Sequence, residues 1–151
     1  MSKAGESNSQ EDRNKPIYTL GVATLVSGIP SHSIRQYVDK GLLVPMKLES
    51  NRHLFSSGDV NRLKWIHTLI REKGLNISGI RALMAIIPCW TIKPCSVSER
   101  ESCGAYYENS VPCWEASDKH RSCMNTDCRE CPVYESICRE GDVKALVRAL
   151  I

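Results

Sequence analysis

Long apolar runs are absent from this 151-residue sequence. No stretch approaches the roughly 18 consecutive apolar residues that a membrane-spanning helix needs, so we expect no membrane partner. Residues 1–16 are polar and lack the apolar stretch of a secretory signal, and we interpret them as a disordered tail. These absences favour a cytoplasmic protein.

Recognisable catalytic constellations are also absent. The sequence contains no legible nucleophile–base pair, pair of carboxylates or phosphate-binding loop, so we expect that the protein is not an enzyme. Its charge is instead uneven. Residues 17–88 hold nine Lys or Arg and four Asp or Glu. Residues 89–151 hold eight Lys or Arg and ten Asp or Glu. We therefore expect only the first half to meet a polyanion such as double-stranded DNA.

Cysteine is missing from the first 88 residues, and all eight cysteines lie between Cys89 and Cys138. This density is too high for ordinary core packing. In a reducing compartment structural disulfides do not persist, so metal ligation or redox chemistry is the leading interpretation of the cysteines. Disulfides remain an alternative.

Two short helices with a tight turn between them are predicted near the start of the basic half. Thr19 is expected to cap a helix over residues 20–27, which Gly28 ends. Ser31 is expected to cap a second helix that runs to Lys40. Such a pair presents its second helix to the major groove of DNA, although a plain helical hairpin is the alternative.

A small β-hairpin and a long helix are predicted next. Residues 46–48 and 52–55 flank a polar turn, which is typical of a hairpin. Ser56 and Asp59 form a pair that resembles a capping box and opens a helix that extends to Lys73.

Asn76 is expected to cap a last helix, which Pro88 ends. The predicted fold is mainly α. It comprises a winged helix-turn-helix domain (17–87), a small irregular cysteine-rich, metal-dependent module (88–140) and a C-terminal helix (141–151).

The basic half resembles the DNA-binding domain of the MerR family of transcription regulators. The segments that carry this resemblance are Tyr18-Thr19-Leu20, Ser27-Gly28-Ile29, residues 33–37, 40–45 and 51–56, Asp59-Val60, Leu63 and Gly74-Leu75. The predicted hairpin, or wing, which contains Asn51-Arg52, and residues 74–81 resemble the heat-shock-repressor and glutamine-repressor branches more closely than the mercury sensor of the family. Two positions depart from the family pattern, because Gln36 replaces an aromatic residue and Val38 replaces an acidic one.

The resemblance implies DNA contacts from the second helix and from the wing. Ser33, Arg35 and Tyr37 lie on the helix expected to enter the major groove, and Arg52 and His53 lie on the wing. Arg35 is suited to a guanine or a phosphate and Tyr37 to a phosphate. Core packing is the alternative for Tyr37, and simple surface exposure is the alternative for His53.

The cysteine-rich module contains a rough internal repeat. Pro88-Cys89-Trp90 recurs as Pro112-Cys113-Trp114, and Cys103-Gly104-Ala105-Tyr106 recurs as Cys131-Pro132-Val133-Tyr134. Cys95 corresponds loosely to Cys123. This pattern resembles the small cysteine–tryptophan modules called two-CW domains.

The cysteine spacing indicates an iron–sulfur cluster. Cys123, Cys128 and Cys131 have the four-then-two spacing of plant-type ferredoxins, and Cys138 is the next cysteine along the chain. Zinc is the alternative, because it accepts similar sets of four cysteines. A second site is expected at Cys89, Cys95, Cys103 and Cys113.

We therefore predict a DNA-binding regulator whose cysteine-rich module senses redox state or metal. The alternative is a DNA-binding regulator or architectural factor with a zinc-stapled structural or partner-docking module. Regulators of this family bind palindromes as homodimers, usually through a coiled coil that Pro88 would interrupt here. We expect the dimer to form through the cysteine-rich module and residues 141–151, with RNA polymerase at the promoter as a further candidate partner.

Overall fold

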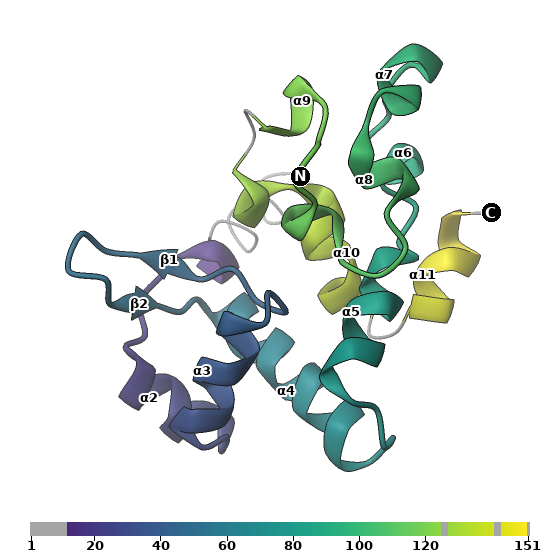
Figure 1. Ribbon diagram of the computed structural model, residues 1–151. Coiled ribbons are helices and arrows are strands. Elements are labelled where there is room, and N and C mark those ends of the chain that lie inside the picture. Colours follow the sequence, from purple (N-terminus) through teal and green to yellow (C-terminus); the bar gives the residue numbers. More distant parts are fainter. Residues whose placement is uncertain (1–11, 125–126, 141–142, 151) are drawn as a thin grey trace, which may run out of the picture. The chain divides into compact units, whose positions relative to one another are not determined.

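The computed structural model describes residues 12–124, 127–140 and 143–150. Within this part the chain is mostly helical and forms two compact units, one ending at Lys73 and the other beginning at Gly74 (Figure 1). No helix among the described residues is long and apolar enough to cross a membrane. Residues 1–16 were expected to form a disordered tail, and 1–11 of these lie outside the described residues.

The first unit contains the predicted helix-turn-helix. Helix α2 spans Leu20–Ser27, with the Thr19 hydroxyl accepting a hydrogen bond from the Val22 amide, and Gly28 ends it at a φ of 76°. Helix α3 spans Ser31–Asp39. Its N-cap is Pro30 rather than Ser31, because the Pro30 carbonyl already accepts bonds from the Ser33 and Ile34 amides.

The wing and the long helix also form as predicted. Strands β1 (Met46–Lys47) and β2 (His53–Leu54) pair antiparallel. Helix α4 spans Ser57–Arg71 and opens with a complete capping box. In this box the Asp59 carboxylate accepts from the Ser56 amide at 2.9 Å and the Ser56 hydroxyl accepts from the Asp59 amide at 3.0 Å. Such a cap satisfies two otherwise orphaned amides.

The core of the first unit lies between α2, α3 and α4, because α2 packs on both of the other helices. Its side chains are almost fully buried and come from these helices and from the segments that join them. They are Ala23, Ile29, Ile34, Tyr37, Leu42, Leu43, Phe55, Val60, Leu63 and Ile66.

Helix α5 (Ile77–Ala85) groups with the cysteine-rich part of the chain. We had expected it within the winged domain at 17–87. The exposed Gly74, with a φ of 72°, separates α4 from α5. The Asn76 side chain then caps α5 by accepting from the Gly79 amide at 2.7 Å, as predicted. Ile80 and Met84 on α5 are buried.

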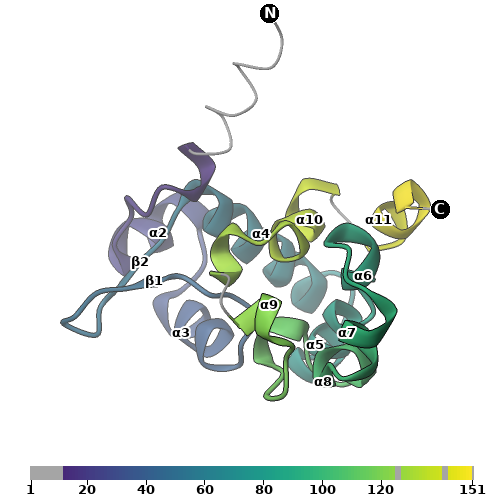
Figure 2. The same ribbon diagram turned by 90° about the horizontal axis from the view of Figure 1, so that it is seen from above.

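The remainder of the second unit consists of very short helices followed by two longer ones. Helices α6, α7 and α8 lie together in both ribbon views (Figures 1 and 2). Helix α11 packs on α10, and Leu146 on α11 is only 3% exposed. The bounds are α6 Cys89–Ile92, α7 Val97–Glu101, α8 Gly104–Tyr107, η1 Cys113–Glu115, α9 Arg121–Met124, η2 Cys128–Glu130, α10 Pro132–Glu140 and α11 Val143–Leu150.

Candidate DNA-binding surface and cysteine-lined cavity

Helix α3 presents a polar outer surface that includes one strong cation. Arg35 is exposed, as are its neighbours His32 and Gln36, whereas Ile34 is fully buried on the opposite side. Ser33 is half-buried. Since a guanidinium has five donors in a rigid fork, Arg35 is suited to base edges and phosphates alike.

Tyr37 lies in the core, which was the alternative to a phosphate contact. Its side chain is only 3% exposed, and its hydroxyl shares a hydrogen bond of 2.9 Å with Nδ1 of His67 on α4. Burial raises the pKa of Tyr37, although the charge of Arg71 and a hydrogen bond with Ser33 act in the opposite direction. Tyr37 therefore fixes α3 against α4. Sequence analysis missed His67, even though it follows the core residue Leu63 by one helical turn.

The wing carries further cations. Arg52 is exposed and His53 is half-buried, with its ring 6.4 Å from the ring of Phe55. Lys47 is exposed and pairs with His53 across the hairpin. The two strands thus bring Lys47, Arg52 and His53 close to one another.

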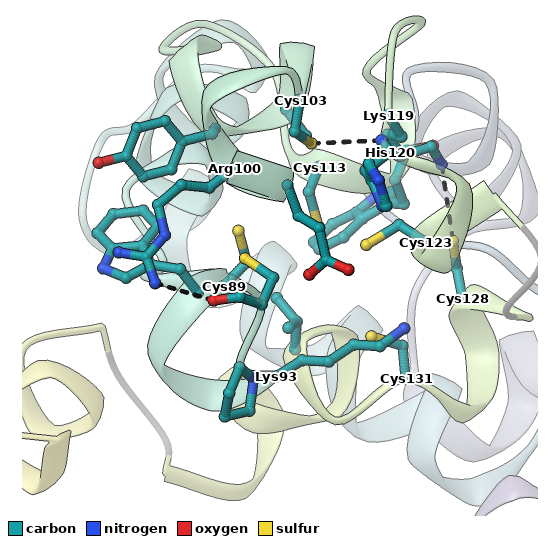
Figure 3. Close-up of a pocket in the computed structure, with 18 residues that line it drawn as sticks. Cys89, Lys93, Arg100, Cys103, Cys113, Lys119, His120, Cys123, Cys128 and Cys131 are labelled. Atoms are coloured by element: carbon teal, nitrogen blue, oxygen red, sulfur yellow. Dashed lines mark hydrogen bonds between the residues drawn. The ribbon is translucent and has the colours of Figure 1, made fainter. Parts of the chain in front are cut away.

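A cavity of about 210 Å³ in the second unit is lined by seven of the eight cysteines (Figure 3). These are Cys89, Cys95, Cys103, Cys113, Cys123, Cys128 and Cys131. Cys138 lies within α10, but its side chain is outside the described residues. Both cysteine sets that the sequence placed in separate sites therefore contribute to one cavity.

All seven described cysteines are free thiols, and two of them accept hydrogen bonds. The His120 amide donates to Sγ of Cys103 at 3.4 Å, and Nζ of Lys119 lies 4.0 Å from Sγ of Cys128. Lys119 also donates to the Trp114 carbonyl at 3.5 Å. Hydrogen bonds to sulfur stabilise thiolates and tune the metal centres that such sulfurs hold. His120 is half-buried and lines the cavity.

The thiols of the cavity are close enough to affect one another's ionisation. Burial raises the pKa of Cys89 to about 11, and charges on Cys123, Cys103 and Cys95 add to the rise. Burial raises the pKa of Cys113 to about 12, with further contributions from Cys89, Cys131 and Cys128. Burial also raises the pKa of Cys128, and the charge of Lys119 opposes this rise. The thiols of Cys89 and Cys113 are therefore protonated at neutral pH.

Aromatic side chains and one arginine surround the cysteines. The rings of Trp90 and Tyr106 meet edge to face at 5.1 Å, and those of Trp114 and Tyr134 do so at the same distance. Arg100 lies over the Tyr106 ring at 6.0 Å and donates to the Cys95 carbonyl at 3.1 Å. Trp90, Arg100, Tyr106 and Trp114 thereby form part of the cavity wall.

The positions of the candidate metal ligands bear on two kinds of site, a single ion and a polynuclear cluster. Among the described residues, no three His, Cys, Asp or Glu side chains converge closely enough to hold a single metal ion. Zinc needs four ligands at roughly 2.0–2.3 Å from one point. A polynuclear cluster instead spreads its thiolate ligands around an inorganic core. The seven described cysteines are spread over the wall of one cavity.

Comparison with known proteins assigns the first part of the chain. The family described as "MerR HTH family regulatory protein" matches residues 18–86. A relative named "HTH-type transcriptional regulator GlnR", from Bacillus anthracis, is 31% identical over 75 residues, and so is its namesake from Bacillus cereus. A relative from Streptomyces coelicolor, "Putative heat shock protein HspR", is 28% identical over 71 residues.

These matches cover about half of each protein. The alignments with the two Bacillus relatives take in 50% of this chain and 57% of the relative, and the Streptomyces alignment takes in 47% of each. The matched region includes the helix pair, the hairpin and the two helices that follow, in the order that the structure has them. Residues 18–86 are therefore a helix-turn-helix domain of the MerR family.

Proposed function

We propose that the protein is a DNA-binding transcription regulator whose cysteine-lined cavity binds an iron–sulfur cluster and thereby senses redox state or metal. The MerR-family domain at residues 18–86 carries the first half of this proposal. The seven cysteines around one cavity carry the second half.

The DNA contacts are assigned to the exposed cations of α3 and the wing. Arg35 on α3 is the candidate for base edges, and Ser33 is close enough in sequence to add a phosphate contact. Arg52, His53 and Lys47 on the wing supply cations for the backbone of an adjacent groove. Tyr37 acts indirectly, because its bond with His67 holds α3 in place.

A homodimer on an inverted repeat fits this kind of domain, because two recognition helices must lie about one DNA turn, or a multiple of it, apart. RNA polymerase at the promoter is a further candidate partner. We had expected residues 141–151 to form part of the dimer interface. Leu146 of α11 is buried against its own chain, so α11 contributes to the fold of the second unit whether or not it also meets a partner.

A bound cluster would supply reversible electron transfer and sensitivity to oxidants. The residues of the chain have three tasks around it. The cysteines ligate the cluster, His120 and Lys119 donate hydrogen bonds to sulfur, and the aromatic pairs limit access of water. Because thiol ligands must be deprotonated to bind a metal, binding the cluster would release protons and stabilise the module.

Binding to DNA is tested with full-length protein, a library of duplexes and a series of salt concentrations. We expect selection of an inverted repeat and an affinity that falls steeply with salt. Arg35→Ala should weaken binding to the selected site by about 1–3 kcal/mol and relax its base preference. The exposed Arg71→Ala on α4 serves as a control for loss of charge. Failure to select any duplex would contradict the proposal.

The cluster is tested by measuring iron, sulfide and zinc in protein purified without oxygen. We expect iron and sulfide in equal amounts, together with visible absorption that oxidants bleach. Stoichiometric zinc without sulfide would instead support a structural zinc site, and the redox proposal would then be wrong.

A further inference from the structure

The two copies of the internal repeat share two local features. The first copy covers residues 88–106 and the second covers residues 112–134. In each copy a proline precedes a short helical turn that begins at a cysteine, at Cys89 in α6 and at Cys113 in η1. Within each copy the tryptophan after that cysteine meets the copy's own tyrosine at 5.1 Å, with interplanar angles of 73° and 84°.

Cysteine spacing follows the same repeat. Seven residues separate Cys95 from Cys103, and seven separate Cys123 from Cys131. Each copy therefore supplies three cysteines at equivalent positions. Cys128 is additional, because Arg100 occupies the equivalent position in the first copy.

The copies are interlocked through their backbones. The Gly104 amide of the first copy donates to the Asp118 carbonyl of the second at 2.7 Å. A Cβ atom on Gly104 would lie 2.8 Å from Cβ of Asp118, so only glycine permits this approach. Next to this contact, Sγ of Cys103 in the first copy accepts from the His120 amide of the second.

The cysteines of the two copies line the same cavity. Figure 3 shows the sulfur atoms of Cys89, Cys113 and Cys123 directed toward the same central space. The cavity, at about 210 Å³, is smaller than the roughly 300–1,000 Å³ of pockets for drug-sized ligands, and it suits one compact cofactor.

We propose that Cys89 of the first copy and Cys113 and Cys123 of the second ligate one shared iron–sulfur cluster. This inference rests on the proposed function and names its ligand set. It replaces two separate sites, one for each group of four cysteines, with a single site that neither copy forms alone. Interlocking of the copies and binding of the cluster then stabilise each other, since a cluster with ligands from both copies holds them together.

The test uses full-length protein that is reconstituted without oxygen with ferrous iron, sulfide and a thiol reductant. Native mass spectrometry of the wild-type chain should show the mass of one cluster per chain. Cys89→Ser and Cys123→Ser should each lose most of the bound iron and sulfide, and the double variant should lose little more. Ser117→Ala, at an exposed position of the second copy, should retain the wild-type content.

Two outcomes separate the inference from the proposed function. Two clusters per chain, or single variants that each keep about half of the iron and sulfide, would overturn the shared site and leave cluster binding intact. Wild-type protein that takes up neither iron nor sulfide would overturn the proposed cluster itself. The mass measurement on wild-type protein decides the number of clusters even if the serine variants fail to fold.

Discussion

The Tyr37 hydroxyl and Nδ1 of His67 are joined by a hydrogen bond of 2.9 Å that ties α3 to α4 across 30 residues of sequence. Tyr37→Phe removes the hydroxyl and deprives the half-buried imidazole of this bond. We expect the free energy of unfolding to fall by about 1 kcal/mol, as measured by urea unfolding. The exposed Tyr107→Phe is the matched control and should change it by less than about 0.5 kcal/mol.

The same variant distinguishes a core role for Tyr37 from a phosphate contact. A phosphate contact contributes to the dependence of DNA affinity on salt, whereas a core residue does not. We therefore expect Tyr37→Phe to leave the slope of log affinity against log salt unchanged. A clearly shallower slope would show that the hydroxyl reaches DNA.

Alkaline pH should weaken the contribution of Tyr37 to stability. Burial raises the pKa of Tyr37 in the folded protein above its ordinary value, so ionisation is less favourable in the folded state than in the unfolded one. The contribution is fully present below a pH of about 10, the ordinary value, and is lost as pH rises through the higher folded pKa. The difference in unfolding free energy between wild type and Tyr37→Phe should therefore stay constant up to a pH of about 10 and narrow above it. A difference that grows with pH would contradict this assignment.

Gly104→Ala should disrupt the cavity without removing a cysteine. The added Cβ would lie 2.8 Å from Cβ of Asp118 and 3.0 Å from its carbonyl oxygen, so the two copies must move apart. We expect the bound iron and sulfide to fall several-fold. Gly21→Ala, in open space on α2, is the control and should leave both unchanged. Full retention of iron and sulfide by Gly104→Ala would show that the contact with Asp118 is not needed for binding.

Cys113→Ser should remove the cofactor and leave the first unit folded. Cys113 lines the cavity and is one of the three proposed ligands. We expect this variant to lose most of its visible absorption and to bind DNA equally well before and after exposure to an oxidant. No cysteine precedes residue 89, so the helical circular dichroism of the first unit should persist. DNA binding that still responds to the oxidant would place the sensing group elsewhere.

Leu146→Ala should destabilise the second unit. Leu146 is only 3% exposed on α11, which packs on α10. Truncation of such a buried leucine costs about 2–5 kcal/mol, because it removes apolar contacts and leaves a cavity. Urea unfolding measures this loss, and sedimentation shows whether the oligomeric state changes with it. Ala149→Gly, at an exposed position of the same helix, should cost only about 1 kcal/mol. A cost for Leu146→Ala no larger than that of the control would contradict burial against α10.

The elements of the first unit were predictable from sequence because their signals are local. Thr19 and Gly28 define the ends of α2, and Ser56 and Asp59 form the capping box that opens α4. Each signal needs only neighbours within a few residues. The pairing of Tyr37 with His67 was not predictable in this way, since apolar periodicity does not specify which polar partner meets a buried hydroxyl.

The candidate site in the second unit was predictable only in part. The repeat in the sequence identified the cysteines and the aromatic residues that recur with them. It did not show that the two sets share one cavity, because sequence spacing describes local loops and not contacts between copies. The contact that interlocks the copies depends on Gly104 and Asp118, which carry no distinctive pattern in the sequence.

Helix α5 falls within the family match at residues 18–86, yet it belongs to the same compact unit as the cysteines. Only Ile86, Ile87 and Pro88 separate it from Cys89. A chimera that joins the cysteine-rich part to a different DNA-binding domain should therefore have its junction at Gly74 and include α5. A junction at Pro88 would instead separate α5, with its buried Ile80 and Met84, from the compact unit to which it belongs.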